Sequence, residues 1–171
     1  MSIVTIDANC DLRADSAAFL KSPSGINCTF IKFGKTGLKC YKSERLCNRS
    51  YANQLAIADV GLAPKVGFKT TVTINMGGVD CTYYAHETDI VEDIFDRAYY
   101  KGLRENGEHD KAFTYYDRFR DAANELSYDL RGHGVTWLDN HPGNVGFDCN
   151  GNAVIIDCAD DLFGGGYVES S

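Results

Sequence analysis

The chain has 171 residues, of which 44% are hydrophobic and 24% charged, and its formal net charge is −7. This length fits one domain or two small lobes, with enough apolar residues to fill a core. The acidic balance argues against a nucleic-acid-binding protein, which is usually basic. No apolar run approaches the roughly 18 residues of a membrane-spanning helix, so we expect neither nucleic acid nor a membrane as a partner.

The N-terminus and the cysteines indicate an intracellular, cytoplasmic protein. Residues 1–7 lack the basic start and apolar stretch of a signal peptide. The seven cysteines form no C-x-x-C pair, and no histidine lies at zinc-ligand spacing from them. We expect buried free thiols in a reducing compartment. The small size would suit a viral protein that acts inside a host cell.

Two hairpins and one helix are predicted in the first half of the chain, after residues 1–24, which show no clear periodicity. The four strands are rich in β-formers between turn signals, and they cover residues 28–33, 38–42, 66–75 and 79–85. Ser43 is a candidate N-cap for a helix over residues 44–60, and Gly61 fits the position just beyond the end of that helix.

Two helices follow in the second half. Thr88 can cap a helix that runs to about residue 101, with one apolar face. A polar loop over residues 102–109 comes next. Apolar residues three and four apart then predict a long helix over residues 110–131, with one face buried.

The last predicted hairpin carries polar residues at both of its ends. Its strands cover residues 145–149 and 153–156, and Asn150-Gly151 predicts a two-residue turn with positive φ at both positions. Because a hairpin brings its ends together, Asn144 and Asp157 should lie side by side. Their hard oxygen atoms are the ligands that Mg²⁺ prefers, completed by phosphate and water.

Asp139, four intervening residues, Asn144, a hairpin and Asp157 together resemble the catalytic loop and metal site of the protein kinase-like superfamily. The lead-in over residues 130–135 is similar to that of many kinases. The His-Pro pair at residues 141–142 resembles phosphotransferases related to aminoglycoside and choline kinases, and some atypical protein kinases share it. The segment over residues 36–42 resembles the strand that carries the ATP lysine.

This resemblance, which runs from about Gly25 to Asp157, implies an α+β, protein kinase-like fold. A small antiparallel N-lobe sheet with one helix would occupy residues 1–86 and bind the nucleotide. A reduced, mainly helical C-lobe with the catalytic loop and the metal-site hairpin would occupy residues 87–171.

The resemblance also implies roles for the loop residues. Asp139 would be the catalytic base for the acceptor hydroxyl, although a loop aspartate can also simply cap backbone amides. His141 would shape the loop or contact phosphate, and a structural hydrogen bond fits it equally well. Asn144 and Asp157 would hold Mg²⁺ on the phosphates of ATP, although turn-forming residues at hairpin ends offer a plainer explanation.

Three further residues would bind the nucleotide. Lys39 would pair with the α- and β-phosphates, with Lys35 and Lys42 as competitors and a solvent-facing strand lysine as the alternative. Gly25 is the glycine available to a phosphate-covering loop. Glu87 falls where the backbone between the lobes would hold the adenine.

The chain also departs from the family. Asn53 or Gln54 stands where a helix glutamate should position the ATP lysine, and Asp157-Cys158-Ala159 replaces the D-F-G motif. Only residues 158–171 follow Asp157, so the helices that hold peptide substrates are missing.

These features leave two hypotheses. The first is an Mg-ATP-dependent phosphotransferase that acts on a hydroxyl group of a protein serine or threonine or of a small molecule. The alternative is a catalytically weak, pseudokinase-like binding module that regulates a protein partner. Such a partner, or a homodimer, would cover the apolar surface left by the missing helices.

Overall fold

The computed structural model describes residues 11–14 and 28–157. The chain divides into two compact units, and the described part of the first comprises residues 11–14, 28–58 and 65–90. The second unit comprises residues 59–64 together with residues from 91 onward. The predicted lobes over residues 1–86 and 87–171 stay a prediction, and Gly25 lies outside the described residues.

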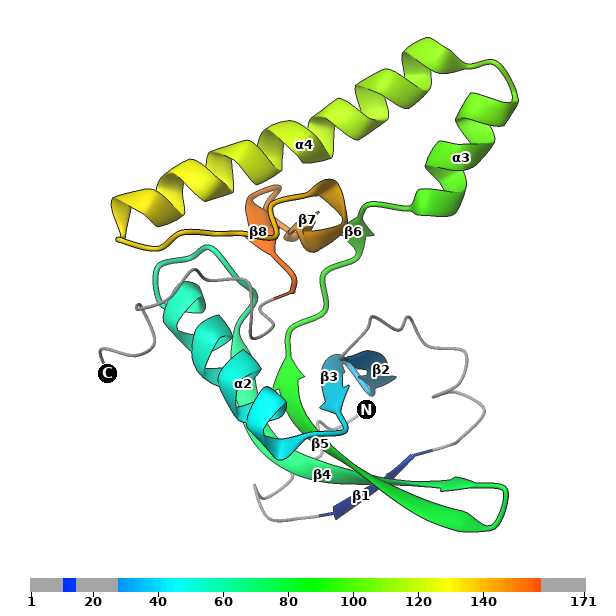
Figure 1. Cartoon of the computed structure of the whole chain (residues 1–171), viewed down its shortest axis with the longest axis vertical. Coiled ribbons are helices and arrows are strands. Elements are labelled where there is room, and N and C mark those ends of the chain that lie inside the picture. Colours follow the sequence, from blue (N-terminus) through cyan, green and yellow to red (C-terminus); the bar gives the residue numbers. More distant parts are fainter. Residues whose placement is uncertain (1–10, 15–27, 158–171) are drawn as a thin grey trace. The chain divides into compact units, whose positions relative to one another are not determined.

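The first unit contains a five-stranded sheet in the order β1-β4-β5-β3-β2 (Figure 1). Its strands are β1 (Asp11–Ala14), β2 (Thr29–Phe33), β3 (Thr36–Tyr41), β4 (Val66–Met76) and β5 (Val79–Thr88). Strands β2 to β5 pair in antiparallel fashion, which confirms the two predicted hairpins, and β1 adds a parallel edge beside β4. Strand β1 was not predicted, because it has only four residues and lies in a segment without clear periodicity.

One face of this sheet is an apolar core. Its buried residues are Ile31, Leu38, Cys40, Val72, Ile74, Tyr83 and Ala85. Because side chains alternate along a strand, Lys39 and Tyr41 of β3 point to the opposite face. Helix α2 (Glu44–Ala58) packs on β3, β4 and β5. The Ser43 hydroxyl accepts a hydrogen bond from the Leu46 amide at 3.4 Å, which confirms the predicted start of this helix.

A buried hydrogen-bond chain joins α2 to the sheet. The Tyr41 hydroxyl donates to Ser50 Oγ at 2.6 Å, and Ser50 Oγ lies 3.1 Å from His86 Nε2. The other ring nitrogen, Nδ1, lies 3.3 Å from the Glu87 carbonyl, which can only accept. His86 Nδ1 therefore carries the proton, and Nε2 accepts from Ser50. Serine beside histidine can form a nucleophilic pair, but both residues are completely buried here and out of reach of a substrate.

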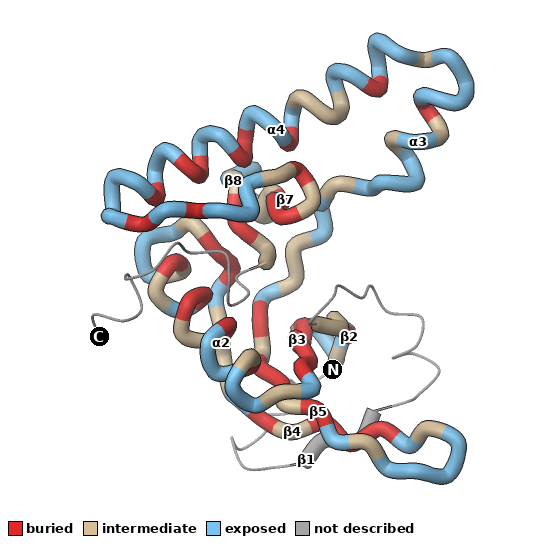
Figure 2. The backbone as a smooth tube through the Cα atoms, in the orientation of Figure 1, coloured by how far each residue is buried: buried red, intermediate tan, exposed pale blue. Residues whose placement is uncertain are grey.

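In the second unit, one long helix packs on a small sheet and a shorter helix packs on the long one. Its helices are α3 (Arg97–Glu105), α4 (His109–Gly132) and the short 3-10 helix η1 (Pro142–Asn144). Its strands are β6 (Asp93–Ile94), β7 (Val145–Phe147) and β8 (Ala153–Ile155), in the order β6-β7-β8. The buried positions of α4 recur along its length (Figure 2), which confirms the predicted long amphipathic helix.

Aromatic rings and one arginine fasten α4 to the sheet. The ring of Phe119 lies 5.6 Å from that of Phe95 and 5.4 Å from that of Phe147, measured between centroids. Arg118 donates two hydrogen bonds to the Asp93 carboxylate, at 3.1 and 2.6 Å, and its guanidinium lies 4.0 Å from the Phe147 ring centroid. These hydrogen bonds hold the pKa of Asp93 below its usual value.

The helix predicted over residues 88–101 is wrong in its first half. Residues 79–88 form one continuous strand, and residues 93–94 pair with β7. The helix begins at Arg97, because the Asp96 side chain accepts a hydrogen bond from the Tyr99 amide at 3.0 Å and caps it. Apolar spacing alone could not locate this start, since strand pairing to a distant segment competes with helix formation.

The two-residue turn predicted at Asn150-Gly151 is also wrong. The strands end at Phe147 and resume at Ala153, and Gly151, at +81°, is the only residue of the intervening loop with positive φ. The Asp148 carboxylate accepts hydrogen bonds from the amides of Asn150 and Asn152, each at 2.9 Å. This local capping favours a longer turn and leaves Asn150 in an ordinary conformation.

The cysteines of the described segments are free thiols, as predicted, but they are not all buried. Cys40 and Cys47 are buried, and burial raises the pKa of Cys47 to about 12. Cys149 is exposed in the β7–β8 loop, which corrects the prediction at this position. Over the described residues, no helix is both long and apolar enough to cross a membrane.

His86 gives a test of the buried hydrogen-bond chain. Burial, together with the nearby charge of Lys39, lowers the pKa of His86 to about 3, whereas in the unfolded chain it lies near 6.5. At a pH between these two pKa values, His86 therefore binds a proton when the protein unfolds. This histidine alone should reduce the free energy of unfolding by about 1.4 kcal/mol per pH unit as the pH falls from about 6 to about 4.

Urea unfolding at several pH values measures this contribution against His86→Gln, which is neutral throughout. The wild-type protein should lose stability more steeply than the variant on acidification. His109→Gln, which changes an exposed histidine, should behave as the wild type does. Equal slopes for wild type and His86→Gln would show that His86 is not buried in its neutral form.

Candidate functional site

The loop that follows α4 holds the predicted catalytic aspartate at the surface. Gly134, with φ of +77°, ends the helix, and the Val135 amide donates to the Leu130 carbonyl at 2.9 Å. Val135 and Trp137 are buried, so their side chains hold the loop against the interior of the unit. Asp139 is exposed.

Asn144 organises this loop from within. Its side chain is buried, and Nδ2 donates to the Asp139 carbonyl at 3.0 Å and to Asp139 Oδ2 at 2.8 Å. Because the amide is planar, these two bonds turn Oδ1 of Asn144 away from Asp139. The arrangement fixes the backbone and the carboxylate of Asp139 and leaves the amide oxygen of Asn144 facing away from Asp139.

His141 supports the same carboxylate from the other side. The Gly143 amide donates to His141 Nδ1 at 3.0 Å, so the proton of the neutral ring is on Nε2. This nitrogen lies 3.3 Å from Asp139 Oδ1 and can donate to it. It also lies 3.1 Å from Asn144 Nδ2, but two donors form no bond with each other. A Cβ at position 143 would lie 2.9 Å from the imidazole, so glycine is required for this close approach.

Backbone pairing brings Asp157 next to Asn144. The Ile156 amide donates to the Asn144 carbonyl at 3.0 Å, and Val145 is paired with Ile155 across β7 and β8. The Ile155 amide also donates to the Leu62 carbonyl at 2.8 Å, which adds a third chain segment to the hairpin. Asp157 thus directly follows Ile156, which is bonded to Asn144, as the predicted hairpin requires. Asp157 is half-buried.

In the first unit, Lys39 is buried on the face of β3 that α2 covers. Its Nζ donates to Gln54 Oε1 at 3.0 Å. Gln54 is one of the two residues predicted at the position of the helix glutamate, and the structure identifies it as the residue of α2 that contacts Lys39. Because Lys39 is buried, the alternative of a solvent-facing strand lysine does not apply to it. The competing Lys35 and Lys42 are exposed.

Glu87 lies inside β5, opposite Leu38 of β3. Its carboxylate covers the backbone of Gly67 so closely that a Cβ on that glycine would collide with it. Its carbonyl oxygen faces His86 Nδ1, as described above. Glu87 therefore belongs to the packed sheet, and the link to the second unit lies beyond Thr88.

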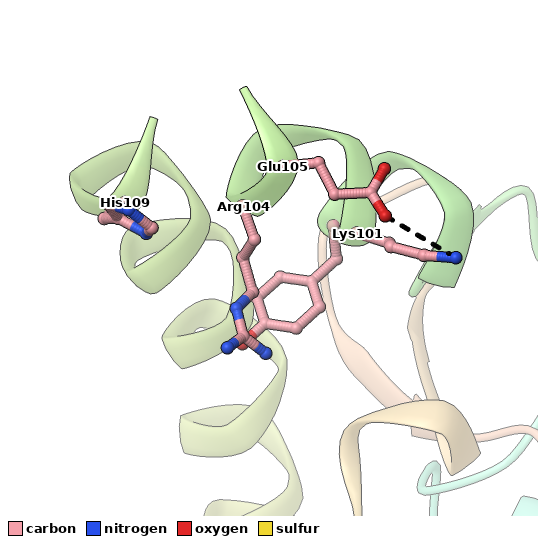
Figure 3. Close-up of a pocket in the computed structure, with 5 residues that line it drawn as sticks. Lys101, Arg104, Glu105 and His109 are labelled. Atoms are coloured by element: carbon pink, nitrogen blue, oxygen red, sulfur yellow. Dashed lines mark ion pairs between the residues drawn. The ribbon is translucent and has the colours of Figure 1, made fainter. Parts of the chain in front are cut away.

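A separate surface pocket of about 470 Å³ lies where α3 meets the start of α4 (Figure 3). Tyr100, Lys101, Arg104, Glu105 and His109 line it. Arg104 lies 5.8 Å from the Tyr100 ring centroid, and Lys101 pairs with Glu105 at 3.6 Å. Four of the five lining residues thus contact one another in pairs at an open surface.

Residues outside the predicted set also contribute. Thr88 accepts a hydrogen bond from Gln54, and no sequence signal could have revealed it because the two residues come from different elements. Within residues 28–157, no three histidine, cysteine, aspartate or glutamate side chains gather as a metal cluster. A site built from one asparagine, one aspartate, phosphate and water is of a different kind.

The sequence matches no protein-family model, and no curated protein is significantly similar to it. What the site can do must therefore be argued from its residues and their geometry.

Asn144→Asp tests the geometry of the loop without reference to any activity. The change is nearly isosteric, but it places a carboxylate oxygen about where Nδ2 now bonds to Asp139. Two ionised carboxylates at this distance repel each other, so the pKa of one of them should rise. We expect a loss of the order of 3 kcal/mol in unfolding free energy at pH 7.

This loss should shrink on acidification, because the folded variant would hold a proton more tightly than the unfolded chain does. Urea unfolding at about pH 7 and pH 5 measures it. Asn144→Ala removes the same hydrogen bonds without adding a charge, so its loss should not shrink in this way. A pH-independent loss in Asn144→Asp would contradict the close approach of Asn144 to Asp139.

Proposed function

We propose that this chain is an Mg-ATP-dependent phosphotransferase with a protein kinase-like fold. The observation that carries the proposal is the double engagement of Asn144. Its side-chain amide holds the carbonyl and carboxylate of Asp139, while its backbone carbonyl accepts from Ile156, the residue before Asp157. A catalytic base and two oxygen ligands of a metal would thus be positioned by one buried residue.

The exposed carboxylate of Asp139 suits the role of base. His141 and Asn144 hold its two oxygens in defined directions, and about half of its side chain remains open to solvent. It would accept the proton of the acceptor hydroxyl as that oxygen bonds to the γ-phosphorus. The bond from the γ-phosphorus to the bridging oxygen would break, and ADP would leave.

Asn144 and Asp157 would hold Mg²⁺, which neutralises the phosphate charge when it is bound. Lys39 would bind the α- and β-phosphates. It lies on a buried strand, and Gln54 of helix α2 holds its ammonium in place. Phosphoryl transfer depends mainly on positioning and charge neutralisation, so this small set of groups is chemically sufficient. The antiparallel sheet with one packed helix supports the kinase-like part of the proposal.

The acceptor would be a hydroxyl group of a small molecule or of a protein side chain. The His141-Pro142 variant favours small molecules or the substrates of atypical protein kinases. The neutral Gln54, in place of an acid, favours the second candidate, a binding module that holds nucleotide without turning it over.

Transfer of labelled γ-phosphate from Mg-ATP tests the proposal, first with the protein alone and then with a cell extract that supplies acceptors. Asp139→Ala should lower the rate by about 10²–10⁴-fold, since it removes the base. Asp157→Ala should abolish the metal-dependent reaction. Asp129→Ala, at an exposed position of α4, should retain the wild-type rate.

Label that is transferred equally by the wild-type and Asp139→Ala proteins would overturn the assignment of the base. No transfer, together with tight nucleotide binding, would favour the binding module. Neither transfer nor nucleotide binding by a folded wild-type protein would overturn both candidates.

Lys39→Met tests the nucleotide site separately. Loss of the ammonium should weaken binding of Mg-ATP by about tenfold or more, because a charge-assisted hydrogen bond to phosphate is worth about 1.5–3 kcal/mol. Isothermal titration calorimetry measures the change. Lys42→Met removes an exposed lysine three residues along the chain and should leave the affinity unchanged. Equal effects of the two substitutions would rule out a specific role for Lys39.

A further inference from the structure

A second buried hydrogen-bond chain in the first unit starts at Lys39. Its ammonium donates to Gln54 Oε1 at 3.0 Å, and Gln54 Nε2 donates to Thr88 Oγ1 at 2.7 Å. The Thr88 hydroxyl then lies 3.3 Å from the Asp89 carbonyl. Lys39, Gln54 and Thr88 are 7%, 0% and 2% exposed, so water does not compete for these bonds.

The chemistry of the three groups fixes the direction of every bond. An ammonium only donates, so the amide oxygen of Gln54 must face Lys39 and its NH₂ group must face Thr88. The Thr88 hydroxyl accepts this bond and directs its own hydrogen to the Asp89 carbonyl, which only accepts. Position 54 thus has to accept from one neighbour and donate to the other. An amide does both, whereas an ionised carboxylate cannot donate.

The hydrogen-bond chain ends at Thr88, whose backbone is held firmly in the sheet. It is the last residue of β5, where it pairs with Gly37 of β3 and with Val66 of β4. The Thr36 hydroxyl also donates to its carbonyl, at 3.2 Å. The second unit begins a few residues later, at Val91. The Gln54 side chain therefore ties the amine of Lys39 to the strand end from which the chain leaves the first unit.

We propose that Gln54 and Thr88 are positioning residues that set the Lys39 amine through a neutral amide–hydroxyl relay. The role of this relay in nucleotide binding rests on the proposed function. Its effect on the Lys39 side chain does not, because the three residues contact one another in the protein without a ligand.

The position of Lys39 can be read by chemical modification of the whole chain. Brief acetylation with N-hydroxysuccinimide acetate, followed by mass spectrometry, gives the labelling of Lys39 relative to the exposed Lys42. We expect Gln54→Ala and Thr88→Val to raise this ratio at least fivefold, because Gln54→Ala removes both bonds of the relay and Thr88→Val removes the acceptor of the second bond. Thr82→Val makes the same substitution at an exposed position of β5 and should leave the ratio unchanged.

Thr88→Ser keeps the hydroxyl and should restore the wild-type ratio, which separates loss of the hydrogen bond from loss of packing. It also covers the case in which Thr88→Val fails to fold. A wild-type ratio in folded Thr88→Val would overturn the relay. A ratio in Thr88→Ser as high as that in Gln54→Ala would overturn it as well.

Calorimetry with Mg-ATP then tests the consequence for the ligand. Gln54→Ala and Thr88→Val should each weaken binding by about tenfold, and the double variant by no more than the Gln54→Ala variant alone. Independent effects that multiply in the double variant would contradict a relay. If the wild-type protein binds no nucleotide, the proposed function fails, while the labelling ratios still decide whether the relay positions Lys39.

Discussion

Buried polar side chains must find hydrogen-bond partners inside the protein, and this requirement organises both units. Leaving such a group unpaired costs about 1–3 kcal/mol, whereas a satisfied bond contributes only about 0.5–1.5 kcal/mol. The penalty for misplacement thus exceeds the gain from each bond. In the first unit, this penalty restricts α2 to the placement in which Ser50 and Gln54 find their hydrogen-bond partners. In the second, Asn144 does the same for the loop and the hairpin.

The balance between apolar and polar burial differs on the two faces of the large sheet. One face carries a continuous apolar core, which stabilises the sheet without directional preference. The face toward α2 carries Lys39, Tyr41, His86 and Thr88, and the buried positions of the helix include Ser50, Asn53 and Gln54. Hydrogen bonds depend on direction, so this polar layer determines where the helix sits. The hydrogen bond to Gln54 holds the Lys39 ammonium within this layer.

In the Asp139 loop, too, hydrogen bonds of a buried polar side chain fix the structure, but fewer residues take part. Among the described residues, the hydrogen bonds and the close ion contact of the Asp139 side chain come from Asn144 and His141, two residues within five positions of it in the sequence. Contacts of this kind depend only on neighbouring residues, so the local sequence is enough to specify them.

The sequence by itself determined most of the elements and the pairing of the hairpins. Alternation, glycine turns and amphipathic spacing depend on neighbours within a few residues, and they predicted α2, α4 and the strands from Thr29 to Thr88. It also determined that Asn144 and Asp157 come together, because a hairpin joins its own ends. Only the tertiary structure decided the start of α3, where pairing of Asp93 with distant Phe147 prevents a longer helix. It alone decided that Lys39 bonds to Gln54 and Gln54 to Thr88, since these partners come from three separate elements.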